Sequence, residues 1–291
     1  MEMPSGAFPE IGGSVFNLKR LSGLVCLACL PALLGVVNVG TASAADETIS
    51  LKTAIVPKGK LYKKRSVPAK MQLSVQVKAP ASSAKINPLK RAVVQFPRDL
   101  TFNPNNRRTP VCSDKSLSET SNLSVGVAGV VKLCPKSVVG TGTAKIYLAK
   151  VHTPASLISD PQLVIFNAGK DKRRNAKIKI YAYSKRTNVG VLMRGKLTRK
   201  GIINVAIPVL SNDSATASFV LAIPGPPLKA GGKTIKGRDA RYARIRCSKG
   251  KWVSRGTFTL GERSYPSGTP TGPSTKVKTK AFKKKCRGAR R

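Results

Sequence analysis

The side chains that could do chemistry are few and scattered in this sequence. His152 is the only histidine, and nucleophilic catalysis normally needs a histidine beside a serine or cysteine. We interpret it as an incidental loop histidine that follows a predicted strand. Asp114 and Glu119 are close in sequence and could form a calcium site or an acid pair, although loop carboxylates that partner lysines are the simpler interpretation. A serine–lysine dyad stays open only because both residue types are abundant. We predict a protein that is not an enzyme, with no catalytic residue, cofactor or metal, and keep an extracellular hydrolase as the alternative.

The segment CPKSVVGTGTAKIYLAK, residues 134–150, is the most motif-like stretch of the chain. Gly140 and Gly142 are too few for a dinucleotide fingerprint, which needs three glycines between a strand and a helix, and the Gly-Lys-Ser/Thr ending of a phosphate loop is missing. The residues after Gly142 alternate between apolar and polar, as in a strand. We therefore predict a strand entry in which the two glycines allow a bulge or a close backbone approach.

The charge of the chain is extreme, because 53 Lys and Arg face 12 Asp and Glu, for a net charge of +41. Such an excess favours anionic partners, namely an anionic cell-wall polymer or anionic lipid. The competing interpretation is general lysine enrichment at solvated positions. Two clusters are the candidate polyanion-binding residues: Lys170, Lys172, Arg173 and Arg174 in a turn, and Lys276, Lys278, Lys280, Lys283, Lys284 and Lys285 near the C-terminus.

Nucleic acid is a weaker partner than charge alone suggests. Aromatic residues make up only 5% of the sequence, and single-strand binders use aromatic rings to stack bases. We expect no specific nucleic-acid partner, and a non-specific nucleic-acid binder remains as a second alternative.

The N-terminal segment predicts export. Lys19 and Arg20 precede an uncharged run over residues 21–40, and an A-x-A site ends at Ala44. This order is typical of a secretory signal peptide cleaved after Ala44, with a membrane anchor as the alternative. We expect a secreted or cell-envelope protein with no transmembrane segment after cleavage. Because residues 1–14 are unusual before a signal peptide, we further hypothesise that translation begins at Val15.

The cysteines predict disulfides. Cys26 and Cys29 leave with the signal peptide, and Cys112, Cys134, Cys247 and Cys286 remain. An even number of cysteines in an exported chain indicates disulfides, and four cysteines allow three connectivities. Their order suggests Cys112–Cys134 and Cys247–Cys286. A zinc site would normally show a close Cys-x-x-Cys pair, which is missing after residue 44.

The remaining sequence is typical of an all-β protein, an antiparallel β-sandwich of the immunoglobulin-like or jelly-roll-like kind. Period-two alternation predicts strands over residues 71–77, 177–183, 202–209, 217–223 and 252–260. In residues 177–183 the lysines should face water if Ile178, Ile180 and Ala182 face the core. Residues 167–169 and Gly231–Gly232 are predicted turns. No helix longer than two turns is expected.

The predicted organisation has four parts. Residues 1–44 are the signal peptide, residues 45–89 form basic N-terminal strands or an arm, and residues 90–265 form the sandwich. Residues 266–291 are a basic C-terminal strand or tail that Cys286 ties back. Alternating lysines on this last segment would also protect a sheet edge from pairing with another chain.

One resemblance extends these expectations. The chain contains FPRDLTFN (96–103), CPKSVVGTGTA (134–144), LVIFNAG (163–169), IKIYAYS (178–184) and RCSKGKW (246–252). In this order it resembles uncharacterised secreted β-rich proteins of high-GC actinobacteria, whose most specific mark is the C-P-x-S-x-V-G-x-G-x-A element. The similarity runs from about Lys90 to Cys286, and it implies an exported, disulfide-bonded sandwich without assigned catalytic residues. This chain departs from that group in its high lysine content.

Overall fold

A computed structural model describes residues 47–79, 85–117, 124–198, 200–208, 210–239, 241–265 and 267–289. All of them belong to one compact unit, Ala42–Arg291. The predicted signal peptide with its cysteines, the cleavage site and the proposed start at Val15 lie outside the described residues.

The prediction of an all-β fold is confirmed, since 52% of the structure is strand and 7% is helix. The helices are α1 (Asp114–Leu117), α3 (Gly126–Leu133) and a short 3₁₀ helix, η1 (Pro154–Ser156). The strands β1 to β17 span, in order, Thr48–Pro57, Val67–Lys78, Leu89–Gln95, Leu100–Phe102, Val138–Leu148, Leu157–Ile158, Gln162–Lys170, Ala176–Ser184, Val189–Leu197, Ile202–Ala206, Ser214–Ile223, Leu228–Ala230, Lys233–Ile235, Ala243–Ile245, Lys251–Leu260, Thr275–Lys278 and Phe282–Lys285.

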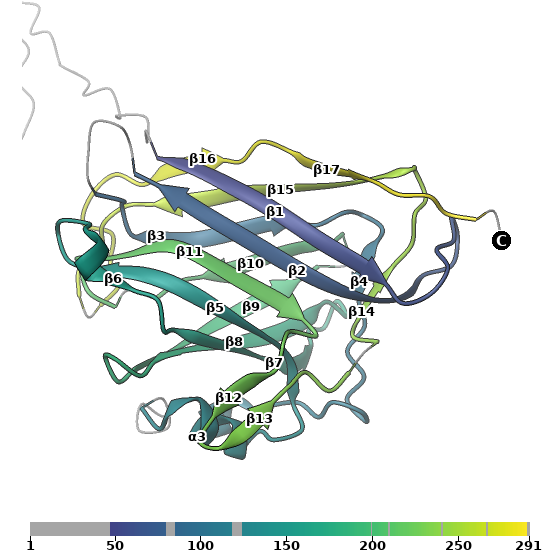
Figure 1. The fold of residues 1–291 in the computed structure, drawn as a ribbon, viewed down its shortest axis with the longest axis horizontal. Coiled ribbons are helices and arrows are strands. Elements are labelled where there is room, and N and C mark those ends of the chain that lie inside the picture. The colour runs from purple at the N-terminus through teal and green to yellow at the C-terminus, as the bar shows by residue number, and fades with distance from the viewer. Residues whose placement is uncertain are drawn as a thin grey trace, which may run out of the picture. The chain divides into compact units, whose positions relative to one another are not determined.

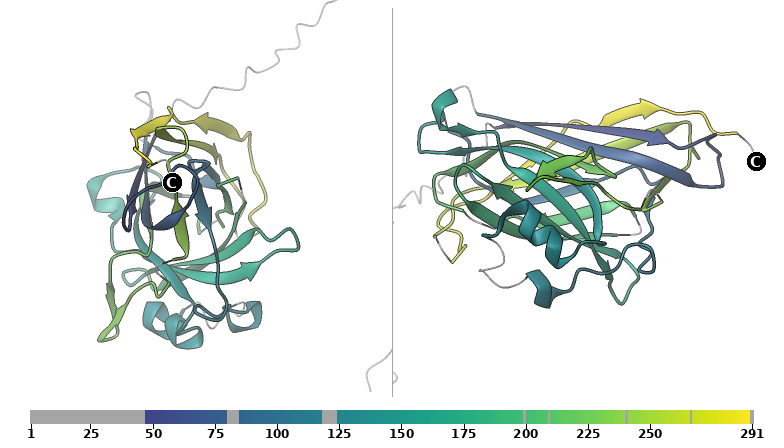
Figure 2. Two further views of the ribbon diagram at one scale, coloured as in Figure 1. Left: turned by 90° about the vertical axis from the view of Figure 1, so that its right-hand side faces the viewer. Right: turned by 60° about the horizontal axis from the view of Figure 1, so that its bottom comes forward.

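Fifteen of these strands form one antiparallel ladder, in the order β16-β15-β3-β10-β9-β8-β7-β5-β11-β2-β14-β4, with β1 on β2, β17 on β15 and β6 on β5. The ladder folds over itself so that β1 packs against β15 (Figures 1 and 2). The hydroxyls of Thr53 on β1 and Ser254 on β15 lie 2.8 Å apart in this contact and are buried. The result is a sandwich whose two layers are parts of one continuous sheet.

The main core fills the space between the layers, and period-two alternation puts its residues there. In β2, Met71, Leu73, Val75 and Val77 are all buried, while Gln72 and Gln76 between them are exposed. Side chains of successive strand residues point to opposite faces, so each strand contributes one apolar row to this core.

A second, smaller core lies on the outer face of β7 and β8. There α1, α3 and the Cys112–Cys134 disulfide cover Phe166 and Tyr181. Both helices lie together against one part of the sheet (Figure 2). Helix α3 has eight residues, just over two turns, so the expected upper limit of two turns was slightly wrong.

Both predicted disulfides are confirmed. Cys112 and Cys134 have Cα atoms 5.4 Å apart and enclose α1 and α3, whereas the Cα atoms of Cys247 and Cys286 are 6.0 Å apart. The second disulfide joins the loop before β15 to the residue after β17, and β16 and β17 both pair with β15. The basic C-terminal segment is therefore part of the sheet. Most of residues 45–89 also belong to the sheet, as strands β1 and β2.

The predicted strand entry at residues 134–150 is also confirmed. The pairing of β5 with β7 shifts between Val138 and Gly140, which is a bulge. A Cβ atom on Gly140 would lie 2.3 Å from the carbonyl oxygen of Ala222, and one on Gly142 would lie 2.0 Å from that of Val220. Only glycine allows the backbone of β11 to approach so closely.

The turn predicted at residues 167–169 was wrong, because these residues lie inside β7. They form a bulge, with a register shift against β8 between Asn167 and Lys170. Asn167 is fully buried, and its amide donates to the carbonyl oxygen of Thr109 while its side-chain oxygen accepts from the Gly169 amide. Asn and Gly favour turns and bulges for the same local reasons, so the sequence pattern does not separate the two.

Candidate functional site

The outer face of one layer carries a continuous distribution of cations. Direct cross-strand partners run Lys278–Thr257–Val93–Asn204–Lys196–Lys177 from β16 to β8, so these residues share one face. Their sequence neighbours, such as Phe258, Val94 and Ile178, are buried in the core. We call the exposed cations of this surface the outer basic face; they are Arg91, Lys177, Arg194, Lys196, Lys251, Arg255, Lys276, Lys278, Lys283 and Lys285.

Two like-charged pairs stand directly opposite each other on the outer basic face. Lys251 of β15 faces Lys285 of β17, and Lys177 of β8 faces Lys196 of β9. Like charges in such register destabilise a sheet. Among the described residues, no lysine of β16 or β17 forms an ion pair with a carboxylate. Within the described residues, this edge of the sheet therefore has like-charge repulsion that no carboxylate relieves.

The predicted cationic turn is the hairpin between β7 and β8, and Lys170, Lys172, Arg173 and Arg174 are all exposed there. The carboxylate of Asp171 fixes the conformation of this hairpin. It accepts hydrogen bonds from the backbone and side chain of Asn175 and from Lys196 Nζ at 2.5 Å. The hydrogen bond from Lys196 is the main reason why the pKa of Asp171 lies well below its ordinary value. The sequence-based prediction included the four cations of this turn, but it did not include Asp171, the carboxylate that orders the turn.

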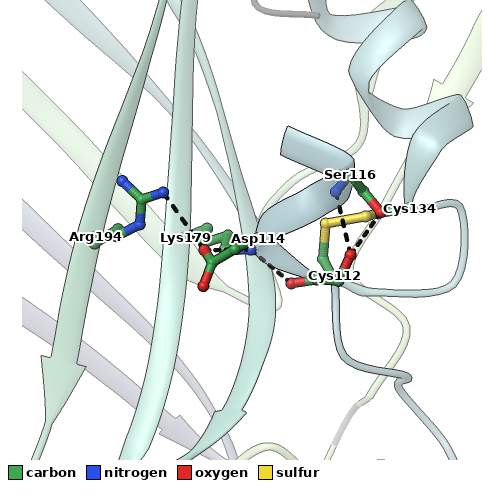
Figure 3. Close-up of polar contacts among 7 residues, drawn as sticks. Cys112, Asp114, Ser116, Cys134, Lys179 and Arg194 are labelled. Carbon is green, nitrogen blue, oxygen red and sulfur yellow. Dashed lines mark hydrogen bonds and ion pairs between the residues drawn. A yellow bond between two sulfur atoms is a disulfide. The ribbon is translucent and has the colours of Figure 1, made fainter. Parts of the chain in front are cut away.

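One lysine of the outer surface is not solvated, which corrects the expectation for residues 177–183. Lys179 shares its face with Lys177, but the segment closed by the Cys112–Cys134 disulfide covers it and leaves it 3% exposed. Its ammonium donates to the carbonyl oxygen of Cys112 at 2.8 Å and pairs with Asp114 at 3.0 Å (Figure 3). Alternation placed this side chain on the correct face, but a covering segment decides whether that face meets water.

The ion pair between buried Lys179 and exposed Asp114 acts as a structural tether. Burial lowers the pKa of Lys179, and the hydrogen bond from Lys179 lowers the pKa of Asp114. Arg194 adds a longer contact to Asp114 at 3.4 Å. The hydroxyls of Ser113 and Ser116 bond to each other at 2.8 Å, and neither bonds to Lys179 within the described residues. The pair connects the residues next to the Cys112–Cys134 disulfide to β8. Neither Ser113 nor Ser116 is hydrogen-bonded to Lys179 as a nucleophile would be.

His152 is a structural acceptor, so its interpretation as an incidental residue was wrong. Its Nδ1 accepts the backbone N–H of Ile86 at 3.0 Å, and its ring stacks on Tyr147 with centroids 4.3 Å apart. Burial lowers the pKa of His152, which keeps the ring neutral as an acceptor.

Asp114 and His152, the described residues considered for hydrolysis, have no contact partner in common. The ion pairs of Asp114 are with Lys179 and Arg194, on β8 and β9, whereas His152 contacts Ile86 and Tyr147. Glu119 lies outside the described residues. Within the described part of the chain, no group of three or more His, Cys, Asp or Glu side chains is arranged to hold a metal ion.

Comparison with protein-family models, curated proteins and solved structures finds no match. The resemblance to secreted actinobacterial proteins therefore stays a prediction. In the described residues, no helix has the length and apolar character needed to cross a membrane.

Proposed function

We propose that this protein is an exported, non-catalytic β-sandwich that binds anionic polymers of the cell envelope through the outer basic face. The observation that carries the proposal is the β15–β17 edge, where Lys251 opposes Lys285 and the neighbouring lysines have no carboxylate partner among the described residues. An acidic polymer along this edge would neutralise repulsion that the fold leaves uncompensated.

The spacing of the cations suits a repeating anion. Lys276 and Lys278 lie two residues apart on one strand, which corresponds to about 6.6 Å, and adjacent strands are about 4.8 Å apart. Rigid strands hold these charges in rows, so binding a polymer costs less side-chain ordering than binding by a mobile tail would. Because lysine acts as a point charge without directional selectivity, binding should fall steeply with salt.

Export is part of the proposal and has one structural support. Both pairs of cysteines form disulfides, which persist in oxidising compartments outside the cytoplasm. The predicted signal peptide over residues 1–44 would deliver the chain there.

Two variants of equal charge test the proposal. The first replaces Lys276, Lys278, Lys283 and Lys285 with glutamine, and the control replaces Lys52, Lys70, Lys78 and Lys145, which are exposed on β1, β2 and β5. We expect the first variant to elute from isolated cell wall at clearly lower salt than the wild type, and the control to elute close to it. Membrane vesicles and DNA serve as parallel matrices. The proposal is contradicted if both variants lose the same affinity for cell wall, or if the wild type is retained equally on all three matrices. Either result would mean that binding depends on total charge and not on the outer basic face.

A further inference from the structure

A largely apolar cavity of about 120 Å³ lies between the two layers of the sandwich. Strands from both layers form its walls, and nearly all of the lining atoms are hydrocarbon. Typical wall residues are Leu73, Ala144, Leu163, Met193, Val205 and Phe219. A native core is normally packed without voids of this size, so the cavity is a departure from ordinary packing.

The cavity reaches the surface at one end of the sandwich. This is the end at which β3 begins and β10 ends, next to the loop that follows β10. Pro208 in that loop lines the cavity and is exposed, and Leu210 lines it and is half-buried. The cavity is therefore not fully enclosed by the core.

Arg263 is the only charged residue in the lining among the described residues. One of its guanidinium nitrogens donates to the carbonyl oxygen of Lys90 at 2.6 Å. Arginine has five N–H donors, and no carboxylate within the described part of the chain pairs with this one. The adjacent carboxylate of Glu262 is bound to Lys85 at 2.7 Å instead. Apart from the bond to Lys90, the guanidinium has no acceptor among the described residues, and it lies beside an apolar space.

Lys90 adds a second cation next to Arg263. It is the extra residue of a bulge, because the pairing of β15 with β3 passes from Thr259–Arg91 to Leu260–Leu89. Strand alternation places its side chain on the same face as those of Ala92 and Val94, where it is 6% exposed and its ammonium donates to the Ser274 hydroxyl at 2.9 Å. Burial and the neighbouring Arg263 lower the pKa of Lys90, and the nearby carboxylate of Glu262 partly opposes them. Lys90 forms no ion pair of its own within the described residues, and bulges of this kind are common next to active sites.

We propose that this cavity binds a small hydrophobic carboxylate, with its hydrocarbon body between the sheet layers and its carboxylate on Arg263. An arginine fork matches a carboxylate in geometry and binds it more strongly than a neutral donor would. Lys90 contributes positive potential behind the arginine. The ligand is distinct from the polymers of the outer basic face, so the two sites are tested separately.

The size of the cavity limits the ligand. An apolar cavity of about 150 Å³ accommodates benzene, so a space of 120 Å³ holds at most about six carbons, and the rest of a longer chain must lie at its open end. Octanoate is a flexible chain near this limit and carries one carboxylate. The alcohol 1-octanol has the same body without the charge and is the matched probe.

Methionine methyl groups report binding directly. Met193 lines the cavity, whereas Met71 is buried in the same core and does not line it. In disulfide-bonded protein with ¹³C-labelled methionine methyl groups, octanoate should shift the Met193 signal in a saturable manner and leave Met71 in place. We expect Arg263→Met to weaken octanoate at least tenfold and to leave octanol unchanged, and Arg255→Met, which removes a cation of the outer basic face, to change neither.

Filling the cavity is the second test. Ala215 is 2% exposed and lines the cavity, so Ala215→Leu should abolish the Met193 shift with both probes. If that variant does not fold, the comparison of Arg263→Met with Arg255→Met decides the matter. The proposal is overturned if octanoate leaves Met193 unshifted at millimolar concentration, or if both arginine variants weaken octanoate equally.

Discussion

The tether between Lys179 and Asp114 gives the most direct test of how this fold handles its charge. The ammonium of Lys179 is buried beneath the disulfide segment, and Asp114 supplies its only carboxylate among the described residues. Asp114→Asn keeps the shape of the side chain and removes the charge. The buried ammonium then retains only the Cys112 carbonyl oxygen and a neutral amide oxygen as acceptors. We expect this substitution to destabilise the fold more than removal of the lysine itself.

The magnitude follows from the exposure of the two partners. Exposed ion pairs contribute about 0.2–1 kcal/mol, whereas removing one partner of a fully buried pair costs about 3–5 kcal/mol. The Lys179 side chain is 4% exposed and that of Asp114 is 70% exposed, so solvent screens one side of the contact. Asp114→Asn should therefore lower the free energy of unfolding by about 1–2 kcal/mol. Lys179→Met should stay within about 1 kcal/mol of the wild type, because losing the ion pair is offset by removing a buried charge.

Urea denaturation of the oxidised protein measures both effects. A loss of about 1.5 kcal/mol corresponds to a midpoint shift of about 0.5 M urea for a slope of about 3 kcal/mol per molar. Arg194→Met is the control, since Arg194 touches Asp114 at 3.4 Å from an exposed position and should change little. The reasoning fails if Asp114→Asn is as stable as the wild type while Lys179→Met loses more than about 2 kcal/mol, because the lysine would then stabilise the fold without its partner.

Two further predictions concern single residues. Burial lowers the pKa of His152 from its ordinary value of 6.5, so the unfolded chain binds more protons below that pH, and stability should fall as pH drops below 6.5 towards the folded-state pKa. His152→Asn keeps an acceptor for the Ile86 amide, and in urea melts from pH 7 to 5 it should remove this slope; an unchanged slope would assign it to other groups. Gly142→Ala should cost about 1–3 kcal/mol through its clash with the Val220 carbonyl oxygen, whereas Gly272→Ala, in open space, should stay within about 0.5 kcal/mol. Equal stabilities of the two glycine variants by thermal denaturation would contradict the close approach.

Much of the fold could be predicted because its signals are local. Alternation of apolar residues fixes which side of a strand is buried, as Met71 and Leu73 show, and four cysteines in an exported chain leave few pairings. The C-P-x-S-x-V-G-x-G-x-A element also has a local explanation. Its cysteine closes a disulfide, and Gly140 and Gly142 admit the backbone of β11. These three residues therefore have structural roles.

The features that escaped prediction depend on contacts between distant segments. Lys179 follows the same alternation as Lys177, and its contacts with Cys112 and Asp114 distinguish its buried environment from the exposed one of Lys177. The cavity has no local signature, since it is the space left where both layers fail to fill the interior. Arg263 is one of 53 basic residues, and only its place in the cavity lining makes it distinctive.

The few acids of this chain explain why its positive charge remains available. Carboxylates are used at points where loops must be held: Asp99 accepts from Ser248 and Arg246, Asp160 from Ser184 and the Arg186 amide. Asp171 orders the β7–β8 hairpin. Asp171 and Asp114 also pair with Lys196 and Arg194 of β9, so carboxylates compensate the outer basic face only at that end. The lysines of β16 and β17 have no carboxylate partner among the described residues, and an anionic partner or screening salt at that edge should therefore stabilise the fold.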